Sequence, residues 1–323
     1  MRILVLGAAG FIGSRLAAAL RARGGFTALV LADSRPPGAS ASAPHAAVAD
    51  GAVRSLQGDI CSEDFLDRVF DQPFDVVYHL AASLTLDAET DFARGMAVNV
   101  HALMRLLERC RAQPAPPRLL FASSISTFGG PLPEVVGDRV AQTPQTSYGT
   151  HKAIAELLIS DYARRGYLDG RALRLPVVLT HPGPPGTSVS DRIASLIREP
   201  LAGKDTTCPL APDTRIPVAS VQAVVTALLR LQDVPAAAFG AGRALNLPSL
   251  TLTPADIAAA VARAPVTHPR GSIRWEPDPQ LQAIVDSWPR GFDSALARSL
   301  GIVADASADA IVARHLEATH VPT

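Results

Sequence analysis

The sequence predicts an α/β fold with a doubly wound parallel sheet and a smaller, discontinuous, α-rich second part. Three observations lead to this prediction. Short, unbroken apolar runs alternate with longer amphipathic stretches through the first 180 residues, which is typical of a parallel sheet covered by helices on both faces. A glycine-rich turn joins the first apolar run to the first amphipathic stretch. After Pro176, prolines become frequent and helical patterns replace the apolar runs.

The expected elements follow from these patterns in order. Apolar runs predict strands over residues 3–6, 29–31, 53–56, 76–78, 119–121 and 172–175, and amphipathic spacing predicts helices over 11–20, 88–111 and 148–165. Further helices are expected over 189–197, 218–229, 255–262 and 292–300, and the proline-rich segment 181–186 is expected to be a rigid loop. Because residues 218–229 and 244–247 could rejoin the sheet, the second part is expected to be discontinuous.

Composition excludes several classes of protein. The 323-residue chain carries 30 basic and 30 acidic side chains, which argues against binding nucleic acid or an anionic membrane through a bulk positive field. The cysteines Cys61, Cys110 and Cys208 lie far apart, so neither a disulfide framework nor a zinc site is expected. The signal-like first 25 residues are interrupted by three glycines and Arg15, and no other stretch reaches the roughly 20 apolar residues of a membrane helix. We expect a soluble, cytoplasmic protein without a metal.

The glycine-rich turn has the features of a dinucleotide site. Gly7, Gly10 and Gly13 follow the first strand and open the first helix, so the backbone can approach a pyrophosphate. The first-turn amides of the helix, including those of Phe11 and Ile12, would face the anion. Asp33 ends the second strand, where a carboxylate binds the adenosine ribose and repels a 2′-phosphate. These residues favour NAD as the cofactor; the nearby Arg35 keeps NADP as an alternative.

This site predicts how the chain is divided between functions. Residues 1–180 are expected to form an NAD-binding Rossmann domain, rejoined by residues 216–247. Residues 181–215 and 248–323 are expected to form the substrate-binding cap.

Tyr148 and Lys152 form the candidate catalytic pair, because residues four apart share a helix face. Lys152 and Lys204 are the two lysines of the chain, and all other basic residues are arginine, which suggests that a compact ammonium is needed. Lowering the pKa of tyrosine from about 10 by about three units takes roughly 4 kcal/mol, which the Lys152 ammonium and an oxidised nicotinamide could supply. Ser124, just after the strand at 119–121, would hold the substrate oxygen. This group could remove a proton from an alcohol while hydride passes to NAD, although an unrelated Tyr/Lys pair at this spacing can also arise by chance.

These residues carry a resemblance to the extended short-chain dehydrogenase/reductases, the NAD-dependent epimerase/dehydratase family, over nearly the whole chain. The matching pieces are the glycine turn, residues 58–60 and 79–82, Asn99, residues 123–124, the Tyr148/Lys152 pair and residues 173–176. The resemblance implies that Lys152 also binds the nicotinamide ribose. It further implies cofactor contacts from Asp59 and Ile60 at the adenine, from Leu80, Ala81 and Ala82 along the cofactor, from Asn99 nearby, and from Pro176 to Val178 at the carboxamide.

Within the family, residues 147–153, 157–166, 172–176 and 197–203 are most similar to dehydrogenases of D-erythronate and related sugar acids. This likeness implies oxidation of the C2 hydroxyl of a small sugar acid to the 2-keto acid. A carboxylate substrate calls for an arginine fork, with Arg192 and Arg215 as candidates. The candidates for binding hydroxyl groups are Ser83, Thr85, Ser124, Ser126, Thr127 and Tyr148.

Other functions on the same fold stay open. An NAD-dependent sugar-nucleotide epimerase would use the same base, whereas a dehydratase needs an acid that the sequence Ser124-Ile125-Ser126 does not offer. A non-catalytic NAD-binding sensor would not need the Ser124, Tyr148 and Lys152 group. By resemblance to the family, the helices expected at 88–111 and 148–165 pair across a two-fold axis, which predicts a homodimer.

Overall fold

The computed structural model describes residues 1–36, 52–179, 188–240 and 242–319. They form two compact units: the first contains Met1–Ser123, Thr146–Arg174 and Leu228–Leu245, and the second contains Ser124–Gln145, Leu175–Ala227 and Asn246–Thr323. These units cut the chain at other places than the predicted functional domains, since residues 124–145 and 216–227 lie in the second unit. The division into cofactor-binding and substrate-binding parts stays a prediction. The loop expected at 181–186 lies outside the described residues.

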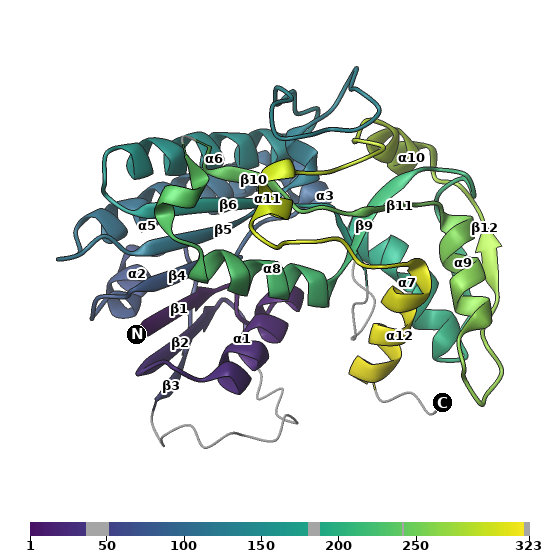
Figure 1. Cartoon of the computed structure of the whole chain (residues 1–323), viewed down its shortest axis with the longest axis horizontal. Coiled ribbons are helices and arrows are strands. Elements are labelled where there is room, and N and C mark those ends of the chain that lie inside the picture. Colours follow the sequence, from purple (N-terminus) through teal and green to yellow (C-terminus); the bar gives the residue numbers. More distant parts are fainter. Residues whose placement is uncertain (37–51, 180–187, 241, 320–323) are drawn as a thin grey trace. The chain divides into compact units, whose positions relative to one another are not determined.

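A seven-stranded sheet forms the centre of the first unit (Figure 1). Its order is β10-β6-β5-β4-β1-β2-β3, and the pairs from β5 to β3 are parallel. The order reverses between β1 and β4, and such a switch point opens a ligand-binding crevice at the carboxyl ends of the strands. The predicted doubly wound sheet is confirmed. The strands are β1 (Arg2–Leu6), β2 (Ala28–Asp33), β3 (Val53–Gln57), β4 (Val76–His79), β5 (Arg118–Ser124), β6 (Asp169–Leu175) and β10 (Ala244–Asn246).

Helices lie on both faces of this sheet. In Figure 1, α1 and α8 lie on one side of it, and α5 and α6 lie on the other. A core of buried aliphatic and aromatic side chains lies between one face of the sheet and the helices α2, α5 and α6. It includes Leu4, Val77, Leu103 and Phe121. The helices are α1 (Phe11–Arg23), α2 (Glu63–Val69), α3 (Thr85–Thr90), α4 (Phe92–Met96), the π-helix η1 (Ala97–His101), α5 (Ala102–Arg111), α6 (Ser147–Arg164) and α8 (Val221–Asp233).

The single helix predicted over 88–111 is wrong. Asp91 has φ −126° and ψ 85°, which ends α3, and its carboxylate accepts a hydrogen bond from the Arg94 amide at 2.9 Å, which begins α4. An aspartate favours this N-cap conformation over a helix interior. The helix then continues through the π-turn at residues 97–101 into α5.

The second unit contains two small sheets as well as helices. One has the order β11-β9-β7, with β7 (Val177–Leu179) parallel and β11 (Leu250–Leu252) antiparallel to β9 (Ile216–Ser220). In the other, β8 (Thr206–Cys208) pairs in parallel with β12 (Ile273–Trp275). The helices are α7 (Val189–Leu201), α9 (Pro254–Arg263), α10 (Pro279–Asp286), α11 (Ala295–Ser299), α12 (Ala308–Thr319) and the 3₁₀ turn η2 (Ile125–Thr127); a further 3₁₀ turn, η3 (Ala236–Phe239), belongs to the first unit.

Two expectations for these segments need correction. Residues 218–220 belong to β9, so the helix predicted over 218–229 begins at Val221. All five residues of β9 are buried, and a short, fully buried apolar run looks the same in sequence whether it is helix or strand. The helix predicted over 292–300 is limited to α11, which Ser294 caps by accepting a hydrogen bond from the Ala297 amide.

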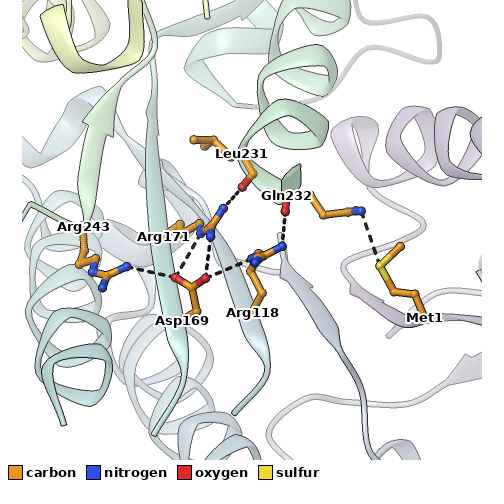
Figure 2. Close-up of polar contacts among 7 residues, drawn as sticks. All are labelled: Met1, Arg118, Asp169, Arg171, Leu231, Gln232 and Arg243. Atoms are coloured by element: carbon orange, nitrogen blue, oxygen red, sulfur yellow. Dashed lines mark hydrogen bonds and ion pairs between the residues drawn. The ribbon is translucent and has the colours of Figure 1, made fainter. Parts of the chain in front are cut away.

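A partly buried ionic cluster joins the amino ends of β5 and β6 to the segment before β10 (Figure 2). Asp169, at the start of β6, accepts hydrogen bonds from Arg171 at 2.6 Å and from Arg118 and Arg243 at 3.1 Å. The Arg171 side chain is fully buried, so its charge depends on these partners. Arg171 and Arg118 also donate to the last turn of α8, where the helix dipole is negative, through the main-chain oxygens of Leu231 and Gln232.

Candidate active site

The glycine turn is as close-packed as a dinucleotide cradle requires. Gly7 has φ +84°, a conformation that favours glycine, and a Cβ atom there would lie 2.6 Å from the Ala81 amide nitrogen. A Cβ on Gly13 would lie 2.0 Å from the Gly7 carbonyl oxygen. Side chains at these positions would push apart the turn, α1 and the loop after β4. The structure therefore brings the glycine turn and residues 80–82 together, as expected for two sides of one cofactor site.

The N-terminus of α1 opens on this turn. Gly10 is the N-cap and has no side chain to accept hydrogen bonds from the first-turn amides, and this turn contains no acidic residue. The backbone amides of a helix N-terminus and the positive end of the helix dipole favour a bound anion. The residues present here thus fit the diphosphate of a dinucleotide.

Asp33 lies beside the same turn. Its Oδ2 accepts a hydrogen bond from the Ala9 amide at 2.9 Å, and its Oδ1 accepts one from the Arg35 amide at 3.0 Å. A carboxylate has about four acceptor positions, so room remains for ribose hydroxyls. The Arg35 side chain reaches back to the Ala9 carbonyl oxygen at 3.1 Å. The arginine that kept NADP as an alternative is thus held beside the candidate ribose site.

The segment after β3 is hydrogen-bonded to β2, the strand that ends at Asp33. The Gly58 amide donates to the Asp33 carbonyl oxygen at 2.9 Å. Asp59 accepts from the Cys61 amide at 2.9 Å and pairs with Arg94 at 3.1 Å. Burial alone would raise the pKa of Asp59, but the Cys61 and Arg94 interactions outweigh it and lower the pKa. Asp59 is therefore a fixed anion, while Ile60 is part of the core.

Asn99 connects the loop after β4 to α6. It lies in the π-turn, is 5% exposed, and its amide makes two hydrogen bonds of 2.9 Å with the Ser83 backbone. Its Nδ2 also lies 3.3 Å from His151 Nδ1 on α6. A π-turn widens the helix locally and is frequent at functional sites. Asn99 therefore fixes the backbone of Ser83, one of the candidate substrate-binding residues.

The N-terminus of α6 is secured by two side chains. The Thr146 hydroxyl accepts from the Gly149 amide at 3.1 Å, and Glu89 on α3 accepts from the Ser147 amide at 2.6 Å. N-capping of this kind stabilises a helix by roughly 1 kcal/mol. Tyr148 therefore projects from a well-ordered first turn.

Tyr148 and Lys152 are brought together as predicted from their spacing. The Lys152 Nζ lies 5.5 Å from the centroid of the Tyr148 ring and 4.4 Å from that of Phe121. It donates a hydrogen bond to the Ala122 carbonyl oxygen at 2.7 Å. Lys152 is 3% exposed. Burial, opposed by the charge of Glu156, lowers the pKa of Lys152 to about 7.

The surroundings of Lys152 are otherwise uncharged or paired. His79, at the end of β4, is buried, and burial together with the Lys152 charge lowers the pKa of His79 to about 3. It is therefore a neutral imidazole at physiological pH. Glu156, one further helical turn along from Lys152, forms a buried ion pair with Arg174. Sequence reasoning missed Glu156, although its spacing from Tyr148 and Lys152 places all three on one face of α6.

Thr85, the first residue of α3, is buried in the first unit. The second unit contains the candidates Ser124, Ser126, Thr127, Pro176, Val178, Arg192 and Arg215. Ser124 is the last residue of β5, and its Oγ accepts from the Ser126 amide at 3.1 Å, while Thr127 donates to the Ser124 carbonyl oxygen at 2.9 Å. All three side chains are buried, so the structure groups these hydroxyls. Pro176 and Val178, expected near the carboxamide, are also buried.

Each candidate arginine of the second unit already has an acidic partner. Arg192 lies 3.7 Å from Asp278, and Arg215 forms a hydrogen-bonded ion pair with Glu134. Both pairs are partly exposed. A substrate carboxylate would have to replace or join one of these partners. Among the described residues, no group of three or more His, Cys, Asp or Glu side chains is arranged to hold a metal.

The sheet order, the glycine turn and Asp33 define a dinucleotide-binding α/β protein with a Tyr/Lys pair on the helix that follows β5. The chain belongs to the NAD-dependent epimerase/dehydratase family, whose model matches residues 3–245. This confirms the predicted family, and with it the prediction of an NAD-dependent enzyme. In the part of the chain that the structure describes, no helix is long and apolar enough to cross a membrane.

Similar proteins cover nearly the whole chain. A D-erythronate dehydrogenase from Cupriavidus necator is 39% identical over 319 residues, which is 98% of each chain. A D-erythronate dehydrogenase from Haemophilus influenzae is 33% identical over 323 residues, covering 98% of this chain and 99% of that one. The crystal structure of a nucleoside-diphosphate-sugar epimerase from Agrobacterium tumefaciens is 33% identical, with a TM-score of 0.88 over 98% of this chain and 94% of that one.

Proposed function

We propose that this protein is an NAD-dependent dehydrogenase that oxidises the C2 hydroxyl of D-erythronate or a closely similar sugar acid to the 2-keto acid. The observation that carries the proposal is the position of Lys152, buried and 5.5 Å from the ring of Tyr148. A cation held there stabilises a phenolate, and a phenolate is a suitable base for an alcohol. The two D-erythronate dehydrogenases support the substrate class.

Each part of the candidate site would have its own role in this reaction. The glycine turn and the α1 amides hold the diphosphate, and Asp33 accepts hydrogen bonds from the adenosine ribose. NAD, when bound, supplies the hydride acceptor. Tyr148, as the phenolate that the Lys152 ammonium stabilises, takes the hydroxyl proton. Ser124 donates a hydrogen bond to the same substrate oxygen and so orients the alcohol.

The substrate-binding assignments follow from the chemistry of a sugar acid. Its carboxylate would pair with Arg192 or Arg215, since arginine binds carboxylates through two parallel hydrogen bonds. Its other hydroxyls would bind Ser83 and Ser126. The hydrogen bonds from Asn99 support the assignment of Ser83, because they hold the Ser83 backbone in place.

An epimerase acting on a sugar nucleotide is the second candidate. The observation that favours it is the likeness to the Agrobacterium tumefaciens epimerase structure. Such a reaction would use the same tyrosine as base and return the hydride to the same substrate, so no NADH would accumulate. A non-catalytic sensor has less support, because it does not explain a buried lysine beside Tyr148.

The test is a substrate panel with the purified full chain. NADH formation is measured with NAD and D-erythronate, L-threonate, a hexuronate or a UDP-hexose, and the organic product is identified by mass spectrometry. NADH and a 2-keto acid from D-erythronate are the expected result. Conversion of only the UDP-hexose without NADH would establish the epimerase instead, and NAD binding without turnover of any compound would favour the sensor.

A further inference from the structure

A single buried carboxylate, that of Glu156 in the middle of α6, holds the carboxyl ends of β5 and β6. Arg174 on β6 donates to both of its oxygens, with distances of 3.0 Å from Nε and 2.7 Å from Nη2. The Ser123 hydroxyl on β5 donates to Oε1. The side chains of Arg174 and Glu156 are 9% and 4% exposed. Removing one partner from such a pair leaves an uncompensated buried charge.

The Glu156 contacts fix the part of β5 that carries the candidate chemistry. Ser123 lies between Ala122, whose carbonyl oxygen accepts the Lys152 hydrogen bond, and Ser124, the proposed substrate-orienting hydroxyl. Glu156 itself lies one helical turn beyond Lys152 on α6. The carboxylate therefore holds the strand segment and the lysine helix in one register.

The charges around Lys152 also involve Glu156. Among the described residues, the charged and titratable groups around the Lys152 ammonium are Tyr148, His151 and Glu156 on α6 and His79 on β4, with Arg174 on β6 behind Glu156. Burial and the Lys152 charge lower the pKa of His151. His79 is neutral at physiological pH, so Glu156 is the anion that offsets the burial of the Lys152 charge. Replacing Glu156 by a neutral group removes a buried negative charge and makes the potential at Lys152 and Tyr148 more positive.

We propose that Glu156 is a positioning residue for the reaction: it holds Ala122 and Ser124 in place through Ser123, and its negative charge favours the ammonium form of Lys152 beside Tyr148. The inference rests on the proposed function, and it assigns a role to a residue that touches neither substrate nor cofactor. It differs from a purely structural role because it requires the ionisation of Lys152 to respond when Glu156 loses its charge.

The chain offers a direct readout of that ionisation. It has two lysines, Lys152 and the exposed Lys204, so NMR of protein labelled with ¹³Cε-lysine yields two lysine signals. In Glu156→Gln, Lys152 is expected to lose its proton at a pH lower by about one unit, while the Lys204 titration stays where it is. An unmoved Lys152 titration would overturn the proposal. This measurement does not need turnover, so it stands even if the substrate panel refutes the proposed function.

Steady-state kinetics supply the second test. Glu156→Gln is expected to lower kcat about tenfold or more, to leave the KM for NAD unchanged, and to move the pH profile of kcat/KM to lower pH. Asp169→Asn is the matched control, because Asp169 is also a partner of arginines and is partly buried, but it lies at the other end of β6 from Arg174. It is expected to lower stability without moving the pH profile. Equal stability loss in both variants with unchanged kcat and pH profile would make Glu156 merely structural.

A milder variant keeps the test usable should Glu156→Gln fail to fold. Ser123→Ala removes the Ser123 hydrogen bond but keeps the Glu156–Arg174 ion pair. It is expected to lower kcat several-fold while the Lys152 titration stays at its wild-type pH. Wild-type kcat in Ser123→Ala would contradict the proposed transmission through β5.

Discussion

The Lys152 Nζ lies 5.5 Å from the centroid of the Tyr148 ring, and its hydrogen bond of 2.7 Å to the Ala122 carbonyl oxygen holds it there. This arrangement explains why a lysine is found at this position in a chain that otherwise uses arginine almost throughout. An ammonium is compact and its pKa changes on burial, whereas a guanidinium is larger and stays charged. The fully buried position between two aromatic rings suits the smaller group.

Burial of Lys152 makes stability depend on pH. Its pKa is about 7 in the folded chain and about 10.4 when unfolded, so between these values the unfolded chain binds more protons and wild-type stability rises with pH. Lys152→Met removes the buried charge and is expected to raise the melting temperature at pH 6, with the gain shrinking as the pH rises toward 10. Thermal unfolding without NAD, followed by circular dichroism, measures this. Lys204→Met, at an exposed site, should show no such trend; a gain from Lys152→Met that is constant with pH would contradict the account.

Asp33 is predicted to select NAD over NADP. Hydrogen bonds to charged groups contribute about 1.5–3 kcal/mol, so Asp33→Ser is expected to weaken NAD binding about ten- to hundredfold and to improve NADP binding, with Arg35 available to the 2′-phosphate. Fluorescence titration with each cofactor measures both affinities. Asp64→Ser, an exposed change on α2, is the control. Unchanged preference for NAD in Asp33→Ser would show that the adenosine ribose lies elsewhere.

The Asp169 cluster is predicted to contribute to stability but not to catalysis (Figure 2). Burial alone would raise the pKa of Asp169, but Arg171 and Arg118 outweigh it and lower the pKa. Its stabilising effect is therefore present above the usual carboxyl pKa of about 4 and is lost as the pH falls through the lower folded value. Asp169→Asn is expected to cost about 3–5 kcal/mol near neutral pH, measured by urea unfolding, with NAD affinity unchanged. A loss below about 1 kcal/mol, the range of exposed ion pairs, would mean that Arg171 finds other partners.

We propose that the helices beside the active site also form a dimer interface. The adjoining helices α4, α5 and α6 each carry a large apolar side chain that is substantially exposed, namely Phe92, Met104 and Leu157. Leu157 is 68% exposed, and burying such a side chain contributes about 1.5–3 kcal/mol. Light scattering is expected to give twice the chain mass for the wild type and the monomer mass for Leu157→Glu. Val303→Glu, a change at an equally exposed residue of the second unit, should stay dimeric; a monomeric wild type would refute the proposal.

The sequence predicted the large sheet because most of its strands, unlike the more exposed β3, are buried on both faces and read as unbroken apolar runs. It could not predict that Asp91 divides a helix or that residues 218–220 belong to a strand. An aspartate can cap a helix or lie on its surface, and a short apolar run can be helix or strand, until the neighbouring elements are known. The same limit applies to the site. Spacing and the scarcity of lysine identified Tyr148 and Lys152, but the Ala122 carbonyl acceptor depends on the register of β5 against α6, which no local pattern encodes.

Oxidation by Tyr148→Phe tests the central claim most directly. The substitution removes the phenolic hydroxyl group and keeps the aromatic ring near which Lys152 lies, so NAD affinity should change little. The rate of NADH formation from D-erythronate should fall by about 10²–10⁴-fold. Tyr162→Phe, on the same helix but hydrogen-bonded to Glu108, should retain wild-type activity. If Tyr148→Phe oxidises D-erythronate as fast as the wild type, Tyr148 is not the base, and the proposed mechanism is contradicted.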